Sequence, residues 1–209
     1  MVELTNLYMF IAASFLLCLA PGPDNIYVLT QGMTKSKKAA IITTLGLCSG
    51  IIIHTTAAAF GISVIFKTSE IAFNIVKFAG AAYLIYIAYQ AFKHRNTPLD
   101  LSVQNSSGEL KKLYLKGFFM NVLNPKVSIF FLAFLPQFVT PANGSVPMQM
   151  ITLGIVFMAL TIIVFSSIGI AGNMLSSKLI EKPSIVKNMN ILTSFVLGGL
   201  AIKLALSSR

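Results

Sequence analysis

The chain has 209 residues, of which 56% are hydrophobic and 11% are charged, and its formal net charge is +10. Soluble domains carry about 25% charged residues, so this composition excludes a globular protein that faces water on all sides. The basic residues lie in short groups between apolar runs, a pattern typical of membrane loops, which argues against a nucleic-acid-binding protein.

The first apolar segment is predicted at residues 5–33, and a Pro-Gly-Pro-Asp sequence interrupts it. Two prolines around a glycine remove backbone hydrogen bonds, so a regular helix cannot continue through Pro21, Gly22 and Pro23. We interpret the run before the break as a retained first span rather than a cleaved signal peptide, because it has no positively charged start. If this broken span is re-entrant, the chain crosses the membrane five times rather than six.

Five further apolar segments are predicted at residues 39–66, 71–92, 117–139, 148–175 and 189–206. A stretch of roughly 20 apolar residues is long enough to cross a bilayer. The second segment contains Gly46 and Gly50, a spacing that lets another helix approach closely, with His54 four residues further on. The expected fold class is therefore an all-α polytopic membrane protein with six transmembrane helices.

The polar connector at residues 93–116 divides the single predicted transmembrane domain, residues 1–209, into halves at 1–92 and 117–209. Basic residues follow the first, third and fifth spans, so the positive-inside rule places these loops in the cytoplasm and both termini outside. With three spans in each half, the second half enters the membrane from the opposite side. This is a 3+3 inverted repeat, an architecture common among transporters.

A second break lies in the fourth segment, where Asn121 and Asn124 precede Pro125 and Lys126. Both breaks lie roughly 14–18 Å from the nearest boundary lysine, counting 1.5 Å per helical residue, which is near the middle of the membrane. Irregular backbone at this depth is tolerated only inside protein or beside a watery cavity. Interrupted segments at corresponding positions of two halves indicate a transporter's substrate site.

Each break carries a charge, because Asp24 and Lys126 both directly follow a proline. Asn124 and Pro125 are typical of the N-cap and first residue of a helix, which puts Lys126 beside the positive end of its own helix dipole. A zwitterionic amino acid would satisfy both charges, with its carboxylate toward Lys126 and its ammonium toward Asp24. The alternative is a structural ion pair that holds the two halves together.

His54 admits two interpretations. A buried neutral histidine bonded to a backbone carbonyl is the more common outcome for such a residue. Histidine also titrates near neutral pH, so His54 is a candidate for proton coupling together with Asp24. Cys18 and Cys48 both lie in apolar segments and are interpreted as small buried thiols.

Three sequence blocks resemble the lysine exporter and homoserine/threonine efflux (LysE/RhtB) family of bacterial amino-acid exporters: LAPGPDNIYVLTQG, FAGAAYLIYIAYQAF and LKGFFMNVLNPKVSIFFLAFLPQFV. The resemblance implies a multi-pass protein of the bacterial inner membrane that exports amino acids, with proton antiport as the expected mechanism. The motif residues that it carries over to the site are Pro21, Gly22, Pro23, Asp24, Asn121, Asn124, Pro125 and Lys126. The loop at residues 36–40 lacks the glycines that relatives often have.

The expected substrate is a neutral amino acid of the threonine, homoserine or leucine type, and a homo-oligomer is compatible with this reading. No enzyme, nucleotide or metal-binding motif is present in the sequence, so we expect no cofactor and no bound metal. Two alternatives stay open: a passive channel or ion exporter on the same scaffold, and a membrane scaffold that transports nothing.

Overall fold

The computed structural model describes residues 2–20, 22–62, 70–96, 110–180 and 183–206, and this part of the chain is helical without strands. The first half contains α1 (Leu4–Leu19), α2 (Pro23–Thr34), α3 (Lys37–Thr56), the π-helical η1 (Ala57–Ile62) and α5 (Glu70–Lys93). The second half contains α6 (Leu110–Val122), α7 (Pro125–Ile129), the π-helical η2 (Phe130–Phe134), the 3-10 turns η3 (Leu135–Phe138) and η4 (Pro141–Asn143), α8 (Val146–Ile180) and α9 (Pro183–Leu206). The expectation of an all-α membrane protein is confirmed.

Three stretches of the described helices are long and apolar enough to cross a membrane: Lys37–Gly61, Asn74–Lys93 and Val146–Met174. Both predicted breaks are present, since α1 and α2 are bent by 58° and α6 is bent by 48° from Pro125–Phe138. Counting each bent pair as one span raises the number to five, and Asn190–Leu206 is a shorter apolar helix. The sixth crossing stays a prediction that depends on this shorter helix.

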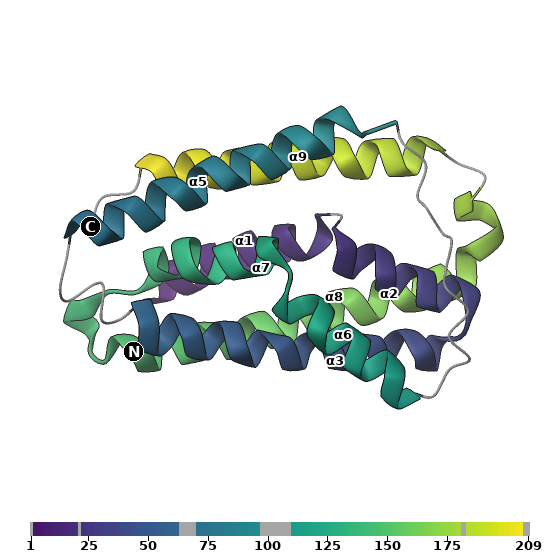
Figure 1. Ribbon diagram of the computed structural model, residues 1–209, viewed down its shortest axis with the longest axis horizontal. Coiled ribbons are helices and arrows are strands. Elements are labelled where there is room, and N and C mark those ends of the chain that lie inside the picture. Colours follow the sequence, from purple (N-terminus) through teal and green to yellow (C-terminus); the bar gives the residue numbers. More distant parts are fainter. Residues whose placement is uncertain (1, 21, 63–69, 97–109, 181–182, 207–209) are drawn as a thin grey trace.

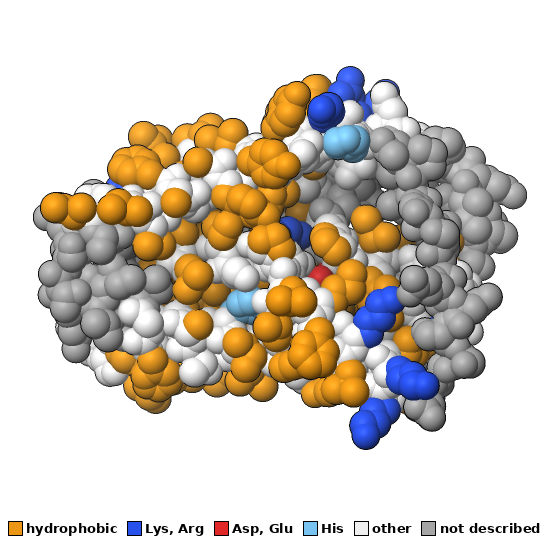
Figure 2. Space-filling model, in the orientation of Figure 1, with side chains coloured by type: hydrophobic (Ala, Val, Ile, Leu, Met, Phe, Trp, Pro, Cys, Tyr) orange, Lys and Arg blue, Asp and Glu red, His pale blue; other side chains and the backbone are white. Residues whose placement is uncertain are grey.

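In Figure 1 the broken pair α1 and α2 runs from left to right, and the broken pair α6 and α7 runs from right to left. The N- and C-terminal ends of the chain lie at one end, which we call the terminal end, and α5 and α9 pack side by side. The opposite end, where α2 ends and α6 begins, we call the basic end. Figure 2 shows most of the visible Lys and Arg side chains toward this end, while apolar side chains cover much of the rest of the face.

Glycines let α3 and α6 pack closely, as the spacing in the second segment predicts. A Cβ on Gly46 would lie 2.1 Å from the carbonyl oxygen of Tyr114, and one on Gly117 would lie 2.6 Å from that of Thr43. A Cβ on Gly50 would lie 2.7 Å from Oδ1 of Asn121. Only residues without a side chain permit this approach, which sets Asn121 directly against α3.

A cluster of phenylalanines fills the interior on the terminal side of the two breaks. Their ring centroids lie 5.1–5.9 Å apart in tilted and edge-to-face pairs that join Phe10, Phe130, Phe131, Phe134, Phe138 and Phe157. All six are buried. Lipid is as apolar as phenylalanine, so inside a membrane this cluster is held by close packing and ring geometry rather than by exclusion of water.

Candidate functional site

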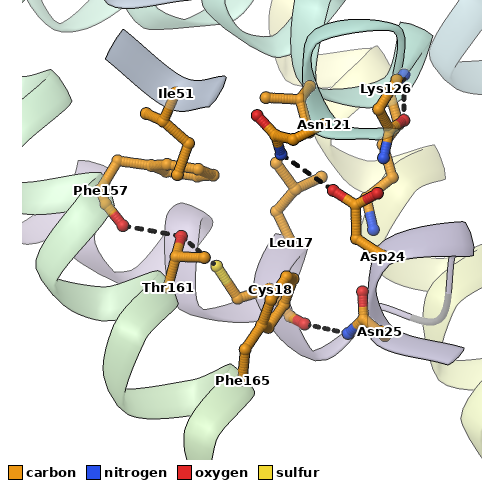
Figure 3. Close-up of a pocket in the computed structure, with 12 residues that line it drawn as sticks. Leu17, Cys18, Asp24, Asn25, Ile51, Asn121, Lys126, Phe157, Thr161 and Phe165 are labelled. Atoms are coloured by element: carbon orange, nitrogen blue, oxygen red, sulfur yellow. Dashed lines mark hydrogen bonds between the residues drawn. The ribbon is translucent and has the colours of Figure 1, made fainter. Parts of the chain in front are cut away.

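The two helix breaks meet at a cavity in the middle of the molecule (Figure 3). Its lining comes from six helices, α1, α2, α3, α6, α7 and α8, and from the N-cap of α7: Leu17, Cys18, Asp24, Asn25, Ile51, Asn121, Asn124, Lys126, Val127, Phe157, Thr161 and Phe165. The cavity volume is about 20 Å³, which is space for about one or two water molecules. An amino acid occupies far more, so the cavity as described is too small to hold one.

Asp24 lies in the first turn of α2 and is 3% exposed. The Asn121 amide Nδ2 donates a hydrogen bond to its Oδ2 at 2.9 Å. Its other oxygen, Oδ1, has no hydrogen-bond partner among the described residues, although the Asn124 side chain faces the same carboxyl group. A carboxylate at a helix N-terminus is favoured by the helix dipole, and Asp24 therefore has both stabilisation and spare acceptor capacity.

Lys126 is the second residue of α7 and is 7% exposed. The predicted N-cap is present, since Asn124 Oδ1 accepts from the Lys126 backbone N–H at 3.0 Å and Pro125 occupies the first helical position. The Lys126 ammonium donates to the carbonyl oxygen of Ala20 at 2.8 Å. Ala20 is the C-cap of α1, whose carbonyl end carries partial negative charge. The misfit of Lys126 with its own helix is thus offset by α1 and does not by itself demand a bound anion.

No ion pair joins Asp24 and Lys126 within the part of the chain that the structure describes. Each charge is bonded to a neutral group instead, Asp24 to Asn121 and Lys126 to Ala20. An ammonium group has three donors, so Lys126 keeps donors beyond the one that Ala20 uses. Because Gly22 has no side chain, it does not cover the Lys126 ammonium, whereas a Cβ at this position would lie 3.3 Å from Nζ.

His54 connects to this site through Asn121. Its Nε2 lies 3.0 Å from the backbone oxygen of Asn121, and since a carbonyl only accepts, Nε2 carries a hydrogen in this arrangement. This is the bonded, buried histidine of the first interpretation above, and it also joins His54 to Asp24 through one residue. The side-chain oxygen of Asn121 has no partner among the described residues. The His54 ring lies against Phe131, with centroids 5.9 Å apart.

Several lining residues were not identified from the sequence. The Asn25 amide Nδ2 donates a hydrogen bond to the carbonyl oxygen of Cys18. Its position directly after Asp24 was the one feature of the sequence that could have identified it as a lining residue. Thr161 of α8 lies 3.5 Å from the Cys18 sulfur and donates to the carbonyl oxygen of Phe157 at 2.8 Å. Helix α8 has no break, and its one charged residue, Lys178, lies near its end, so the sequence does not mark this face. Of the predicted site residues, Pro21 lies outside the described residues, while Pro23 and Pro125 begin their helices.

Comparisons with known proteins place this architecture in a family. The family of LysE type translocators matches residues 15–208. A homoserine/homoserine lactone efflux protein of Salmonella typhimurium (strain LT2) is 30% identical over 159 residues, which cover 76% of each chain. The uncharacterized membrane protein YrhP of Bacillus subtilis (strain 168) is 27% identical, with 97% of this chain and 99% of that protein covered. No solved structure matches. The chain therefore belongs to the family of LysE type translocators, and it is a membrane transporter rather than an enzyme.

Proposed function

We propose that this protein exports neutral amino acids from the cytoplasm in exchange for protons. Its setting is the bacterial inner membrane, with the basic end in the cytoplasm and residues 1–209 acting as one transmembrane domain. The observation that carries the proposal is the pair of opposite charges in one central cavity, neither of which is neutralised by the other. The name of the Salmonella relative, an efflux protein for homoserine and its lactone, supports the substrate class.

The site offers complementary groups to both ends of a zwitterion. The substrate ammonium would bind the two unpaired oxygens, Asp24 Oδ1 and Asn121 Oδ1. The substrate carboxylate would bind the spare donors of the Lys126 ammonium, next to the space left by Gly22 at the start of α2. Leaving either buried charge unpaired is costly in a membrane, so both contacts favour the zwitterion over a molecule with one charge.

The rest of the lining indicates a neutral side chain. Leu17, Ile51 and Phe165 are apolar, and Cys18 and Thr161 provide small polar groups on the same cavity. Among the described residues that line the cavity, none besides Asp24 and Lys126 is charged, so no third charge is available for a lysine- or glutamate-like substrate. Because the cavity volume is only about 20 Å³, the substrate must enter a more open conformation. A site that has to open for its substrate fits alternating access, in which the cavity opens first to one side of the membrane and then to the other.

Proton exchange is assigned to Asp24 and His54, which Asn121 links. A proton on Asp24 would remove the counter-charge of the substrate ammonium and favour release. A return to the carboxylate on the cytoplasmic side would restore binding. This mechanism couples one proton entering to one amino acid leaving at the same group, Asp24, with His54 as a second group nearby that can hold a proton.

The test loads wild-type cells with dipeptides that are hydrolysed inside and measures which free amino acid leaves. We expect one or a few neutral amino acids to leave faster than from cells that carry Lys126→Gln. Efflux of all amino acids at rates set by their gradients alone would indicate a passive channel. Equal efflux from cells with and without the protein would indicate that it does not transport amino acids.

A further inference from the structure

A second group of unpaired polar atoms lies between the cavity and the basic end. Gln31 of α2 is 1% exposed, and neither its Oε1 nor its Nε2 has a hydrogen-bond partner among the described residues. The hydroxyls of Thr43 and Thr44 on α3 are also buried without a partner in this part of the chain. Buried side-chain amides are nearly always bonded, so an unpaired one requires an explanation.

Helix geometry places Gln31 and Thr44 on the faces that line the cavity. Gln31 follows Asp24 by seven residues on α2, and Thr44 precedes the lining residue Ile51 by seven on α3. Seven residues are about two turns, so each pair shares one helix face, separated by roughly 10 Å along the axis. Helices α2 and α3 pack against each other, and both displacements point toward the basic end (Figure 1).

Helix α8 closes this region through a close contact with α2. A Cβ on Gly32 would lie 2.0 Å from the carbonyl oxygen of Gly169, and one on Gly169 would lie 2.5 Å from Cβ of Ala40 on α3. The side chain of Asn173 adds a hydrogen bond from Nδ2 to the Gly32 carbonyl at 2.9 Å. Helices α2 and α8 are therefore in close backbone contact beside Gln31, and α8 also packs closely on Ala40 of α3.

We propose that Gln31 lies on the path by which the substrate reaches the Asp24 and Lys126 site from the basic end, and that the Gly32–Gly169 contact closes this path in the form described here. The proposal rests on the proposed transport function. A carboxamide donates and accepts, so Gln31 matches both the carboxylate and the ammonium of an amino acid passing it. When α8 moves away from α2, water or substrate supplies the partners that the amide lacks in the closed form.

Cysteine accessibility tests the path without using any substrate. Gln31→Cys is introduced into the otherwise unchanged protein in membrane vesicles, and a small thiol reagent is applied from either side. Mass spectrometry then assigns the modified residue. The matched control is Leu113→Cys, since Leu113 of α6 is 2% exposed and precedes Asn121 by eight residues, at a similar depth. Thr44→Cys is the second path variant, in case Gln31→Cys does not fold.

From the basic side, the cysteine at 31 should react about tenfold faster than the one at 113, because the path opens locally from time to time even without substrate, whereas the surroundings of residue 113 stay packed. Adding Asn173→Ala removes the hydrogen bond to Gly32, and the loss of one hydrogen bond corresponds to a factor of about five. The reaction of Gln31→Cys should therefore become about fivefold faster, and that of Leu113→Cys should not change. The proposal would be overturned if the thiol reagent modified Gln31→Cys, Thr44→Cys and Leu113→Cys at the same slow rate. It would also be overturned if Gln31→Cys reacted faster from the terminal side than from the basic side. If Gln31→Cys reacted quickly from the basic side in vesicles that export no amino acid, the proposed function would be wrong, although a path to residue 31 would still be present.

Discussion

Gly50→Ala tests how closely the position of Asn121 depends on the α3–α6 contact. The added Cβ would lie 2.7 Å from Asn121 Oδ1, 2.9 Å from Asn121 Cβ and 3.1 Å from the Phe118 carbonyl oxygen. Ordinary contact begins at 3.4 Å, so α6 must move by up to 3.4 − 2.7 = 0.7 Å. The side chain cannot turn away freely, because Nδ2 of Asn121 is bonded to Asp24. Overpacking of this kind costs about 1–3 kcal/mol.

A shift of that size stretches the 2.9 Å bond between Asn121 and Asp24 beyond hydrogen-bond distance. We expect Gly50→Ala to unfold in detergent at lower denaturant concentration than the wild type, and to export more slowly. Gly198→Ala is the matched control, since nothing lies within 4 Å of a Cβ at that helical position. Alanine is a better helix former than glycine, so this control should be as stable as the wild type or more so.

If Gly50→Ala matches the wild type in both unfolding and export, α6 has room to move and does not hold Asn121 in place. If Gly198→Ala is equally damaging, the effect belongs to glycine in membrane helices generally rather than to this contact.

Two further predictions concern topology and coupling. Reporter fusions at Asn105 and Arg209 should give cytoplasmic and external signals respectively, because basic loops stay in the cytoplasm, and both signals on one side would contradict six crossings. Wild-type export should speed up as the outside is made more acidic than the cytoplasm, since proton entry drives amino-acid exit. Asp24→Asn or His54→Gln should flatten this pH dependence, and wild-type pH profiles in both variants would show that the proton path lies elsewhere.

The local features of the site could be predicted because they depend on a few neighbouring residues. Proline chemistry alone determines where the helices break, and the Asn124 cap with Pro125 follows from backbone geometry. The partner of Lys126 could not be predicted in this way. Its ammonium bonds to the Ala20 carbonyl, 106 positions earlier in the sequence, and only the tertiary fold brings the end of α1 to the start of α7.

The contribution of α8 to the cavity lining could not be predicted from the sequence, for a related reason. Thr161 lies in a long, mostly apolar helix whose one charged residue, Lys178, is near its end, so hydropathy does not distinguish the side that meets the cavity. Gln31 was equally inconspicuous, since a glutamine near the end of a span normally reaches water. Its significance comes from burial and missing partners, which are properties of the packed structure.

The most direct test of the two-charge site is the pair of single variants, Asp24→Asn and Lys126→Gln, compared with the double variant. Asp24 and Lys126 attract each other across the cavity although they form no ion pair, so each single change leaves the other buried charge without an opposite charge nearby. Each single variant should therefore lose export and some stability. We predict that the double variant regains wild-type stability and still exports nothing, because neither end of the zwitterion then has a counter-charge. Export by the double variant near the wild-type rate, or by Lys126→Gln alone, would contradict the account.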